Sequence, residues 1–576
     1  MYVLGIWDGH DSGAALLKDG QIAFAANEER FTRKKLEVEF PFCAVREALA
    51  FAGIRPADVG LVAVSTSDFA KTLTRVFPGM KRRYYLIRRR KVRPTVLSRF
   101  SKTSKYVLTE IGPSRLTRSV SSWAVKKALG SLGFSDYPLV WVHHHLAHAA
   151  AAVYTSPFSK GLFLSLDGIG DGLSGMLGTF DEGGIRVLKE YGGRDSLGIF
   201  FEHVTNLLNM RELEDEGKVM ALASFGYPIP DAQNPLLPLF TVDGLDIKAR
   251  YHSIGLYRKL KEILFLYPSE QFAYMAQRVL EVCISELVEN ARRETGLADL
   301  AYAGGVASNI KVNMLLKNSP GLDHLYVFPH MGDGGLALGA AIHASRQAFG
   351  TSHVGLDDLF LGPAPTRAEI EAEIERSGVR YERLPDIEDH AAELISRGEI
   401  LLWYQGRMEY GPRALGDRSI LAVPSSVAVK NRLNVFLKKR VWYQPFCPSM
   451  LEEDAAEILE DYNGVNNRFM TVGYMVKPRY ADRMVAVINA DNSCRPQILG
   501  ADEASRYGRY YPLLRRLKER TGAGVVLNTS FNKHGESIIN TPREALELLL
   551  NSQFNYLVME DYLIWKDGSP GSGRSS

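Results

Sequence analysis

Residues 2–29 read YVLGIWDGHDSGAALLKDGQIAFAANEE, and residues 162–190 read LFLSLDGIGDGLSGMLGTFDEGGIRVLKE. Each stretch starts with an apolar run that ends in Asp-Gly, and two further short runs follow after glycine-containing turns. Short apolar runs bounded by glycine and aspartate predict β-strands, so each stretch is expected to form a three-stranded meander. Because the same unit occurs twice, the sequence predicts a duplicated α/β domain with a cleft between its halves.

This duplicated layout is typical of the actin, sugar-kinase and heat-shock ATPase superfamily. There, two Gly-Asp turns face each other across the phosphates of a nucleotide. Glycine lets the backbone approach the phosphates, and the carboxylates handle a metal ion or water. Two unrelated β-meanders are the simpler alternative. Helices are expected at 41–52, 121–132, 143–155 and 271–295, and strand–turn–helix units at 299–316 and 324–344.

A connector is expected at 350–366 (GTSHVGLDDLFLGPAPT), after which the pattern restarts with a helix at 366–377 and further strands. We therefore expect an N-terminal domain over 1–355, a second α/β domain over 366–565, and a disordered polar tail over 566–576. The segment 80–118 is strongly basic. A solvated surface insertion is the preferred interpretation, and a contact for an anionic acceptor or partner is the alternative.

Composition excludes several classes of protein. The chain has 576 residues with a net charge of +3, so no global attraction to nucleic acid is expected. The 4 cysteines are scattered and form no CxxC pair, which argues against a disulfide framework or a cysteine zinc site. Neither a signal peptide nor an apolar run long enough for a membrane span is recognised. A cytoplasmic location is the default expectation.

The strongest local signal is HHHLAHA at 143–149. His144 and His148 are four residues apart, so on a helix they share one face and could share one metal ion, while His143 and His145 point elsewhere. Imidazole suits Zn, Fe, Ni or Cu. An oxygen ligand could come from one of the acidic turns that hold Asp167, Asp171 and Asp333. Histidines satisfied by hydrogen bonds alone are the alternative.

The first Gly-Asp turn carries Asp8, His10 and Asp11. A histidine there is a candidate general base because its unperturbed pKa is near neutral pH, and a turn-stabilising Asx motif is the alternative. Glycine turns before helices can hold phosphate or ribose on N-terminal amides. Such motifs occur at 216–218, 304–309 and 332–335. Together with the second Gly-Asp turn, they give these candidate ATP-binding residues: Gly168, Gly170, Glu216, Lys218, Gly304, Gly305, Asn309, Gly332 and Gly334.

The second domain carries a different signature, YGPRALGDRS at 410–419. Arginines around a glycine turn, with nearby lysine, hydroxyl and amide donors, match an oxyanion such as phosphate. Surface salt bridging is the alternative. The candidate oxyanion-binding residues are Arg413, Arg418, Lys438, Arg440, Arg495, Asn528 and Ser530.

Together these motifs resemble the NodU/CmcH-type O-carbamoyltransferases, the family that includes the tobramycin carbamoyltransferase. The resemblance covers nearly the whole chain, and the order and spacing of the motifs make it specific. The matching stretches are LGIWDGHDSGAAL, EERFTRKK, HHLAHAAAA, LDGIGDG, EGKVMALASFG, GGVASN, MGDGGLALGAA, YGPRALGDRSIL, RPQ and NTSFN.

The resemblance implies a TsaD-like ATPase domain followed by a YrdC-like domain. It implies that carbamoyl phosphate is hydrolysed to carbamate in the YrdC-like site. Carbamate would then attack the α-phosphorus of ATP, giving carbamoyl adenylate and pyrophosphate. A small-molecule hydroxyl would finally take the carbamoyl group and release AMP. Because carbamate decomposes in water, a closed cavity would protect it.

Residue roles follow from the resemblance. His144, His148 and Asp333 would ligate a divalent metal, iron first and magnesium as the alternative, with Asp167 at or beside it. His10 would be the base near the acceptor hydroxyl, with Asp8 and Lys35 in the same pocket. The oxyanion set given above would hold carbamoyl phosphate.

Two features depart from the family pattern. The family reads K-x-R-E-x-F-R-P-F-A-P, whereas this chain reads KKRVWYQPFCP, so Val441 replaces Glu and Gln444 replaces Arg. Gln444 can still donate a hydrogen bond to phosphate, but one lost charge-assisted contact would be worth about 1.5–3 kcal/mol. The basic segment 80–118 is the second departure.

Three other functions are compatible with parts of this sequence. A carbamoyl-adenylate enzyme acting on a macromolecule would be expected to carry zinc-finger cysteines or a more basic chain. A nucleotide-binding sensor or scaffold without turnover is favoured only by Gln444. A sugar or acid kinase does not explain the second domain. The motifs predict the reaction but not the acceptor, because variable loops build the acceptor pocket.

Overall fold

The computed structural model describes residues 1–93, 108–351, 353–439, 441–465 and 467–566. The chain divides into two compact units. Unit 1 comprises Met1–Glu28 and Leu36–Leu356, and unit 2 comprises Glu29–Lys35 and Asp357–Ser576. The expected disordered tail, apart from its first residue, lies outside the described residues.

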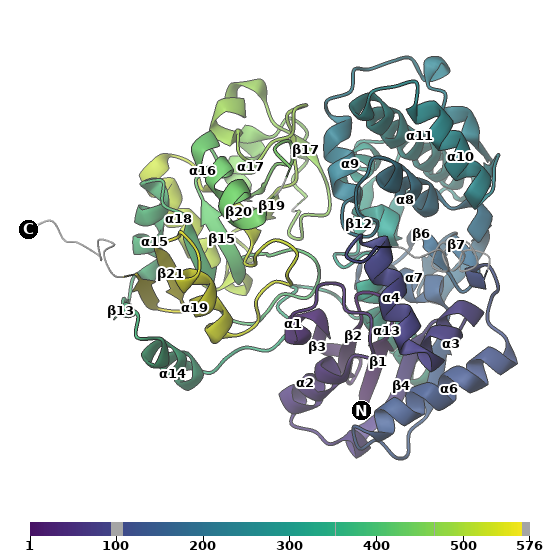
Figure 1. Ribbon diagram of the computed structural model, residues 1–576, viewed down its shortest axis with the longest axis horizontal. Coiled ribbons are helices and arrows are strands. Elements are labelled where there is room, and N and C mark those ends of the chain that lie inside the picture. The colour runs from purple at the N-terminus through teal and green to yellow at the C-terminus, as the bar shows by residue number, and fades with distance from the viewer. Residues whose placement is uncertain (94–107, 352, 440, 466, 567–576) are drawn as a thin grey trace, which may run out of the picture. The chain divides into compact units, whose positions relative to one another are not determined.

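The first half of unit 1 is a five-stranded sheet with the order β3-β2-β1-β4-β5. Figure 1 labels its strands β1 to β4. Strands β1 to β3 form the antiparallel meander, β4 pairs parallel with β1, and β5 pairs parallel with β4. Because β1 and β2 are buried almost throughout, both faces of the sheet are covered. The strands span Tyr2–Trp7, Gly13–Lys18, Gln21–Asn27, Val59–Ser65 and Leu139–Val142.

The second half of unit 1 repeats this arrangement. Its sheet has the order β8-β7-β6-β11-β12, with an antiparallel meander β6 to β8 and with β11 and β12 added in parallel. The strands span Gly161–Gly170, Leu173–Asp181, Gly184–Gly192, Asp299–Ala303 and His324–Val327. Both sheets therefore follow the order third, second, first, fourth, fifth, which confirms the predicted duplicated, actin- and sugar-kinase-like α/β fold.

Two helices pack against each other in the middle of unit 1. Helix α13 (Leu336–Phe349) lies on the first sheet, and α7 (His144–Thr155) lies on the second. Glycine permits their contact, because a Cβ added at Gly339 would lie 1.9 Å from the carbonyl oxygen of Ala147. This close packing brings the N-terminal ends of both helices into the same region. Asp333 lies just before α13, and His144 and His148 lie in α7.

Of the remaining helices of unit 1, α2, α6, α11 and α12 lie where the sequence predicts them, whereas α3, α8 and α10 were not predicted. The helix expected at 121–132 begins earlier, at Arg115, because the Ser114 hydroxyl accepts a hydrogen bond from the Thr117 N–H and caps it. The helices are α2 (Phe42–Ala52), α3 (Phe69–Val76), α4 (Pro78–Arg88), α6 (Arg115–Gly130), α8 (Leu197–Leu207), α9 (Glu216–Ala223), α10 (Ser253–Leu264), α11 (Ser269–Thr295) and α12 (Ile310–Lys317).

In the described part of 80–118, basic residues such as Arg82, Arg83 and Arg90 are exposed, as a solvated insertion predicts, but three others are not. Lys81 and Arg89 are buried, with 6% and 5% exposure, and the side chain of Arg88 is 9% exposed. Helix α4 thus has one basic face that is exposed, while Arg88 and Arg89 meet acidic partners within unit 1. Residues 94–107 of the segment lie outside the described residues.

Unit 2 is built on an eight-stranded mixed sheet with the order β13-β22-β21-β14-β15-β20-β16-β19. Helices α15 and α18 pack together over apolar side chains of this sheet, including Trp403 and Leu421. The strands span Arg380–Arg383, Tyr562–Trp565, Tyr556–Met559, Leu401–Tyr404, Arg418–Ala422, Val525–Ser530, Cys447–Leu451 and Gln497–Leu499. The longer helices are α14 (Arg367–Ser377), α15 (Ile387–Ser396), α17 (Glu452–Ile458), α18 (Tyr510–Thr521) and α19 (Pro542–Leu550).

The segment Glu29–Lys35, which contains the short helix α1 (Glu29–Thr32), belongs to unit 2. The Arg30 guanidinium donates to the carbonyl of Gly411 at 2.5 Å and to the Ser537 hydroxyl at 3.3 Å. The Arg33 guanidinium donates to the carbonyls of Ser537 and Ile538 at 2.8 and 2.6 Å. A piece of the N-terminal sequence therefore completes the C-terminal unit.

Across the described residues, the model contains no helix whose length and apolarity would suit a membrane crossing.

Candidate functional site

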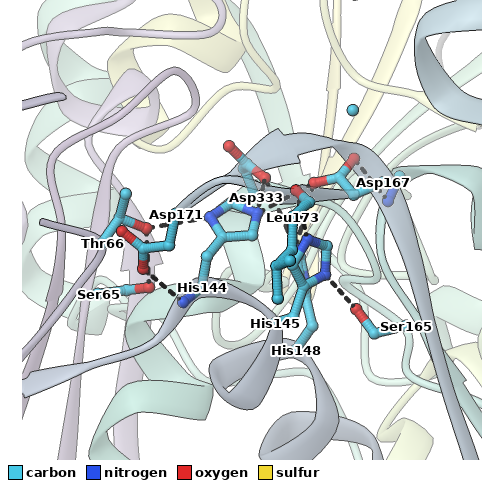
Figure 2. A network of polar contacts seen from close by, with 12 residues as sticks. Ser65, Thr66, His144, His145, His148, Ser165, Asp167, Asp171, Leu173 and Asp333 are labelled. Carbon is cyan, nitrogen blue, oxygen red and sulfur yellow. Dashed lines mark hydrogen bonds and ion pairs between the residues drawn. The ribbon is translucent and has the colours of Figure 1, made fainter. Parts of the chain in front are cut away.

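Two histidines and two aspartates converge at the ends of α7 and α13 (Figure 2). The ligand atoms of His144, His148, Asp167 and Asp333 all lie within 4.8 Å of one another. The Nε2 atoms of His144 and His148 lie 3.2 and 3.3 Å from Oδ2 of Asp167, and 3.4 and 3.6 Å from Oδ1 of Asp333. The structure thus brings together all four residues predicted to bind a metal.

Outer partners orient the four side chains. Nδ1 of His144 lies 3.0 Å from the Thr66 hydroxyl, so its Nε2 faces the two carboxylates. The Gly305 N–H donates to Oδ1 of Asp167 at 3.1 Å. Asp171 lies outside the group of four: its carboxylate accepts from the main-chain N–H groups of Ser67 and His144, both at 2.9 Å, and so holds the start of α7.

The chemistry of the four donors fits a divalent transition metal. Two imidazole nitrogens and two carboxylates suit iron, zinc or manganese better than magnesium, which prefers oxygen ligands. Burial alone would lower the pKa of His148, but hydrogen bonds to Asp167 and Asp333 raise it to about 9. The two carboxylates therefore already stabilise positive charge at this point, which is what a cation would supply.

The other histidines of the cluster have structural roles. The His143 side chain accepts from the His145 N–H and caps α7, as its position before the helix predicts. Nδ1 of His145 lies 2.8 Å from the Ser165 hydroxyl, and its Nε2 lies 3.0 Å from the carbonyl of Leu173. His145 thus attaches α7 to the second sheet.

His10 lies beside the four-residue group. Its Nδ1 is 3.2 Å from Oδ2 of Asp333, so one carboxylate contacts both the candidate base and the candidate metal ligands. The Tyr85 ring stacks on the imidazole with a centroid distance of 5.5 Å and an interplanar angle of 25°. The main-chain carbonyl of His10 accepts a hydrogen bond from Nε1 of Trp7 at 2.8 Å.

Asp8 forms a buried ion cluster instead of pointing to solvent. Its carboxylate pairs with Arg75 at 2.8 Å and with Lys71 at 2.9 Å. Burial alone would raise the pKa of Asp8, but the charges of Arg75 and Lys71 hold it well below its usual range. Burial lowers the pKa of Lys71 to about 8. The sequence did not mark Lys71 or Arg75, because nothing in a helix sequence shows which turn it will contact.

Lys35, the third predicted catalytic residue, lies in the segment assigned to unit 2. Its role near Asp8 and His10 stays a prediction.

The candidate ATP-binding glycines differ in their surroundings. A Cβ added at Gly170 would lie 2.2 Å from the His144 ring, and one at Gly334 would lie 2.2 Å from the His330 ring. Gly304 has a φ of +91°, and an added Cβ would lie 2.1 Å from the carbonyl oxygen of Leu166. These glycines are required by packing. Around Gly168 and Gly332 an added Cβ would meet nothing within 3.7 Å, so these turns leave room for another group.

The polar members of the ATP-binding set have local partners. The Glu216 carboxylate accepts from the Leu213 N–H at 2.7 Å, and burial raises its pKa to about 7. Lys218 pairs with Asp215 at 2.7 Å. Asn309 caps α12 by accepting from the Lys311 and Val312 N–H groups. Contacts of these residues with ATP stay predictions.

In unit 2 several of the predicted oxyanion residues lie at one edge of the sheet. Strand β15 begins at Arg418, β20 ends at Ser530, and β16 begins at Cys447. Because β15 and β16 both run antiparallel to β20, these three positions share an edge. Arg495 precedes β19, which runs parallel to β16, so it reaches the same edge.

Arg418 is fully buried, and its guanidinium faces main-chain carbonyls. It donates to Asp417 and Gly406, both at 3.1 Å, and to Gln405, and it stacks 3.7 Å above the centroid of the Tyr404 ring. Its Nε has no hydrogen-bond partner among the described residues.

The other oxyanion candidates are also held in place. Nζ of Lys438 donates to the Ser530 hydroxyl at 3.2 Å and to Oδ1 of Asn532 at 2.6 Å. Arg495 donates to Sγ of Cys447 at 3.0 Å, and Nδ2 of Asn528 donates to the carbonyl of Ala414 at 3.1 Å. Arg413 is half-buried. Arg440 lies outside the described residues.

Glu409 is a structural residue that sequence reasoning missed. Its Oε1 accepts from the N–H groups of Leu415, Asp417 and Arg418 at 3.0, 2.9 and 2.9 Å. The loop YGPRALGDRS is thus wound around one buried carboxylate that immediately precedes it. A glutamate next to a glycine-rich signature was the available clue.

Two models of known protein families match this chain. The model described as "Carbamoyltransferase N-terminus" matches residues 2–342, and "Carbamoyltransferase C-terminus" matches residues 392–566. The chain belongs to the carbamoyltransferase family.

Relatives of this carbamoyltransferase include an uncharacterized protein of Methanocaldococcus jannaschii, 33% identical over 78% of this chain and 77% of that protein. The nodulation protein NolNO of Sinorhizobium fredii is 31% identical over 97% of this chain and 79% of its own length. The 3'-hydroxymethylcephem-O-carbamoyltransferase of Streptomyces clavuligerus is 31% identical over 57% of this chain and 60% of its own. The N-terminal family model covers the four-residue group of unit 1. The C-terminal family model covers the sheet edge of unit 2 where candidate oxyanion residues lie, which we call the oxyanion edge.

Proposed function

We propose that this carbamoyltransferase transfers the carbamoyl group of carbamoyl phosphate to a hydroxyl of a small-molecule acceptor through an ATP-derived carbamoyl adenylate. The observation that carries the proposal is the convergence of His144, His148, Asp167 and Asp333 within 4.8 Å in a duplicated ATPase fold. An O-carbamoyltransferase among the relatives supports a hydroxyl acceptor. A divalent metal held by these four residues would neutralise charge on the ATP phosphates.

Unit 2 is proposed to be the YrdC-like domain that processes carbamoyl phosphate. Two buried polar atoms at one edge of its sheet support this role, because each lacks a hydrogen-bond partner among the described residues: Nε of Arg418 and Nε of Arg495. Buried polar atoms normally have partners, and two guanidinium N–H donors match an oxyanion. We propose that carbamoyl phosphate is split here into carbamate and phosphate.

We propose that two reaction steps take place in unit 1. A carbamate oxygen attacks the α-phosphorus of ATP, and pyrophosphate leaves. The acceptor oxygen then attacks the carbamoyl carbon while His10 takes the proton from the acceptor hydroxyl, and AMP leaves. Because Asp333 contacts Nδ1 of His10, it favours the tautomer that presents a lone pair on Nε2. His10 thus acts as the general base of the second step.

The test is product analysis with ATP, carbamoyl phosphate, ferrous iron and hydroxylamine as a surrogate acceptor. We expect AMP and pyrophosphate, formed only when carbamoyl phosphate is present. Formation of ADP would instead indicate a kinase, and AMP formation independent of carbamoyl phosphate would contradict the adenylate route. Omitting hydroxylamine separates activation of the carbamoyl group from its transfer.

Gln444 gives a prediction about carbamoyl phosphate affinity. It lies before β16 at the oxyanion edge, and its Oε1 is buried without a hydrogen-bond partner among the described residues. Gln444→Arg is expected to lower the KM for carbamoyl phosphate by about tenfold or more, because a charge-assisted contact is worth about 1.5–3 kcal/mol. Steady-state kinetics check this, and the KM for ATP serves as the internal control. An unchanged KM for carbamoyl phosphate would show that residue 444 does not face the phosphate.

A further inference from the structure

Helix α4 connects the His10 turn with the second half of unit 1. At one end, Nζ of Lys81 donates to the main-chain carbonyl of Asp8. One turn later the Tyr85 ring stacks on His10. Lys81, Tyr85, Arg88 and Arg89 are spaced at four, seven and eight residues, so they lie on one face of the helix.

The other end of α4 is held by buried ion pairs that we call the α4 clamp. Arg88 pairs with Glu202 and, at 2.7 Å, with Glu212, and Arg89 pairs with Glu214. The side chains of Glu212 and Glu214 are 1% and 4% exposed, so these charges are largely desolvated. Buried pairs of this kind hold a fixed geometry, since removing one partner leaves an uncompensated buried charge.

We propose that Tyr85 is a positioning residue for His10, and that the α4 clamp holds it there. This inference rests on the proposed role of His10 in the transfer step. Asp333 contacts the imidazole at Nδ1, and Tyr85 covers one of its faces, so the ring is held in two directions at once. With the ring so held, Nε2 is presented in one orientation to the acceptor hydroxyl.

The proposal predicts a change confined to one half-reaction. Formation of carbamoyl adenylate does not need His10, whereas transfer to the acceptor does. Tyr85→Ala is therefore expected to leave carbamoyl phosphate-dependent exchange of pyrophosphate into ATP within about twofold of wild type. Transfer to hydroxylamine, measured as AMP release, should fall about tenfold or more, because misplacing a reacting group by about 1 Å can cost about 100-fold.

Three variants complete the design. Tyr85→Phe keeps the ring and is expected to retain transfer, whereas His10→Ala should show the same selective loss as Tyr85→Ala. Tyr227→Ala removes a tyrosine that is 63% exposed and should change neither half-reaction. Arg89→Glu is expected to lower transfer as Tyr85→Ala does, and the added change Glu214→Arg should restore it by reversing the pair.

The outcomes separate the inference from the function on which it rests. If wild type shows no carbamoyl phosphate-dependent exchange, the adenylate route fails, and the inference fails with it. If wild type shows exchange but Tyr85→Ala transfers normally, only the positioning role is overturned. If exchange and transfer fall in parallel in Tyr85→Ala, with its melting temperature lowered, Tyr85 serves the stability of unit 1 and not His10.

Discussion

Replacing His148 with alanine is expected to abolish carbamoyl phosphate-dependent AMP formation and to remove the bound metal. His148 is 1% exposed, and its Nε2 lies 3.3 and 3.6 Å from the two carboxylates of the proposed metal site. Loss of an outer-shell partner already costs about 10–100-fold in metal affinity or activity, so loss of a ligand should cost more than about 100-fold.

The measurement pairs product analysis with metal content determined by elemental analysis of purified protein. Wild type is expected to bind one divalent ion, and His148→Ala none. His324→Ala is the matched control. His324 is exposed, pairs with Asp299 at 2.7 Å, and is not part of the four-residue group. If His148→Ala kept both its metal and its activity, the four residues would be a hydrogen-bonded cluster and not a metal site.

Replacing Asp8 with asparagine is expected to destabilise unit 1 by about 3–5 kcal/mol, because it leaves Arg75 and Lys71 as uncompensated buried charges. The side chains of Asp8 and Arg75 are 5% and 2% exposed, so solvent cannot take over the lost interaction. Urea unfolding of wild type and variant measures the difference. Asp246→Asn removes a partly exposed partner of Lys189 and is expected to cost no more than about 0.5 kcal/mol.

The pH dependence gives a second check on Asp8. Its pKa is depressed in the folded protein, so the ion cluster contributes stability above the unfolded-state pKa of about 3.9, and this contribution is lost as the pH falls through the folded-state value. The difference between wild type and Asp8→Asn should therefore be full at neutral pH and shrink in strong acid. An equal difference at all pH values would show that the carboxylate charge is not responsible.

Much of unit 1 could be predicted from sequence because its signals are local. The repeated Gly-Asp meanders gave the duplicated sheets, and the spacing of His144 and His148 gave their common face. Asp167 lies in β6 and Asp333 follows β12, two strands of the same sheet, so their convergence was also accessible. The contacts that were missed join residues far apart in the chain: the Asp8 partners on α3, the acidic partners of α4, and the membership of 29–35 in unit 2. Nothing in the local pattern of a basic helix distinguishes a solvated face from one that meets buried carboxylates.

The site of unit 2 was less accessible for a related reason. The arginines were recognised as a set, but Arg418 donates to carbonyls of its own loop and of the preceding strand end, a role that composition does not show. Similarly, Glu409 organises the loop through three N–H groups that any residue type would supply. Hydrogen bonds from side chains to main-chain groups therefore cannot be predicted from the residue types alone.

The place of Glu29–Lys35 in unit 2 has a consequence for how the chain matures during synthesis. Arg30 and Ser537 are 507 residues apart, so this segment emerges from the ribosome long before its partners exist. Translation proceeds from the N-terminus at about 5–20 residues per second, which leaves the segment without its native partners for roughly 25–100 seconds. In that interval two arginines must remain solvated beside a newly formed sheet, and the C-terminal unit acquires its last element from the oldest part of the chain. Contacts of such long range are characteristic of slow folding, so the docking of this segment is expected to be a late step in the folding of unit 2.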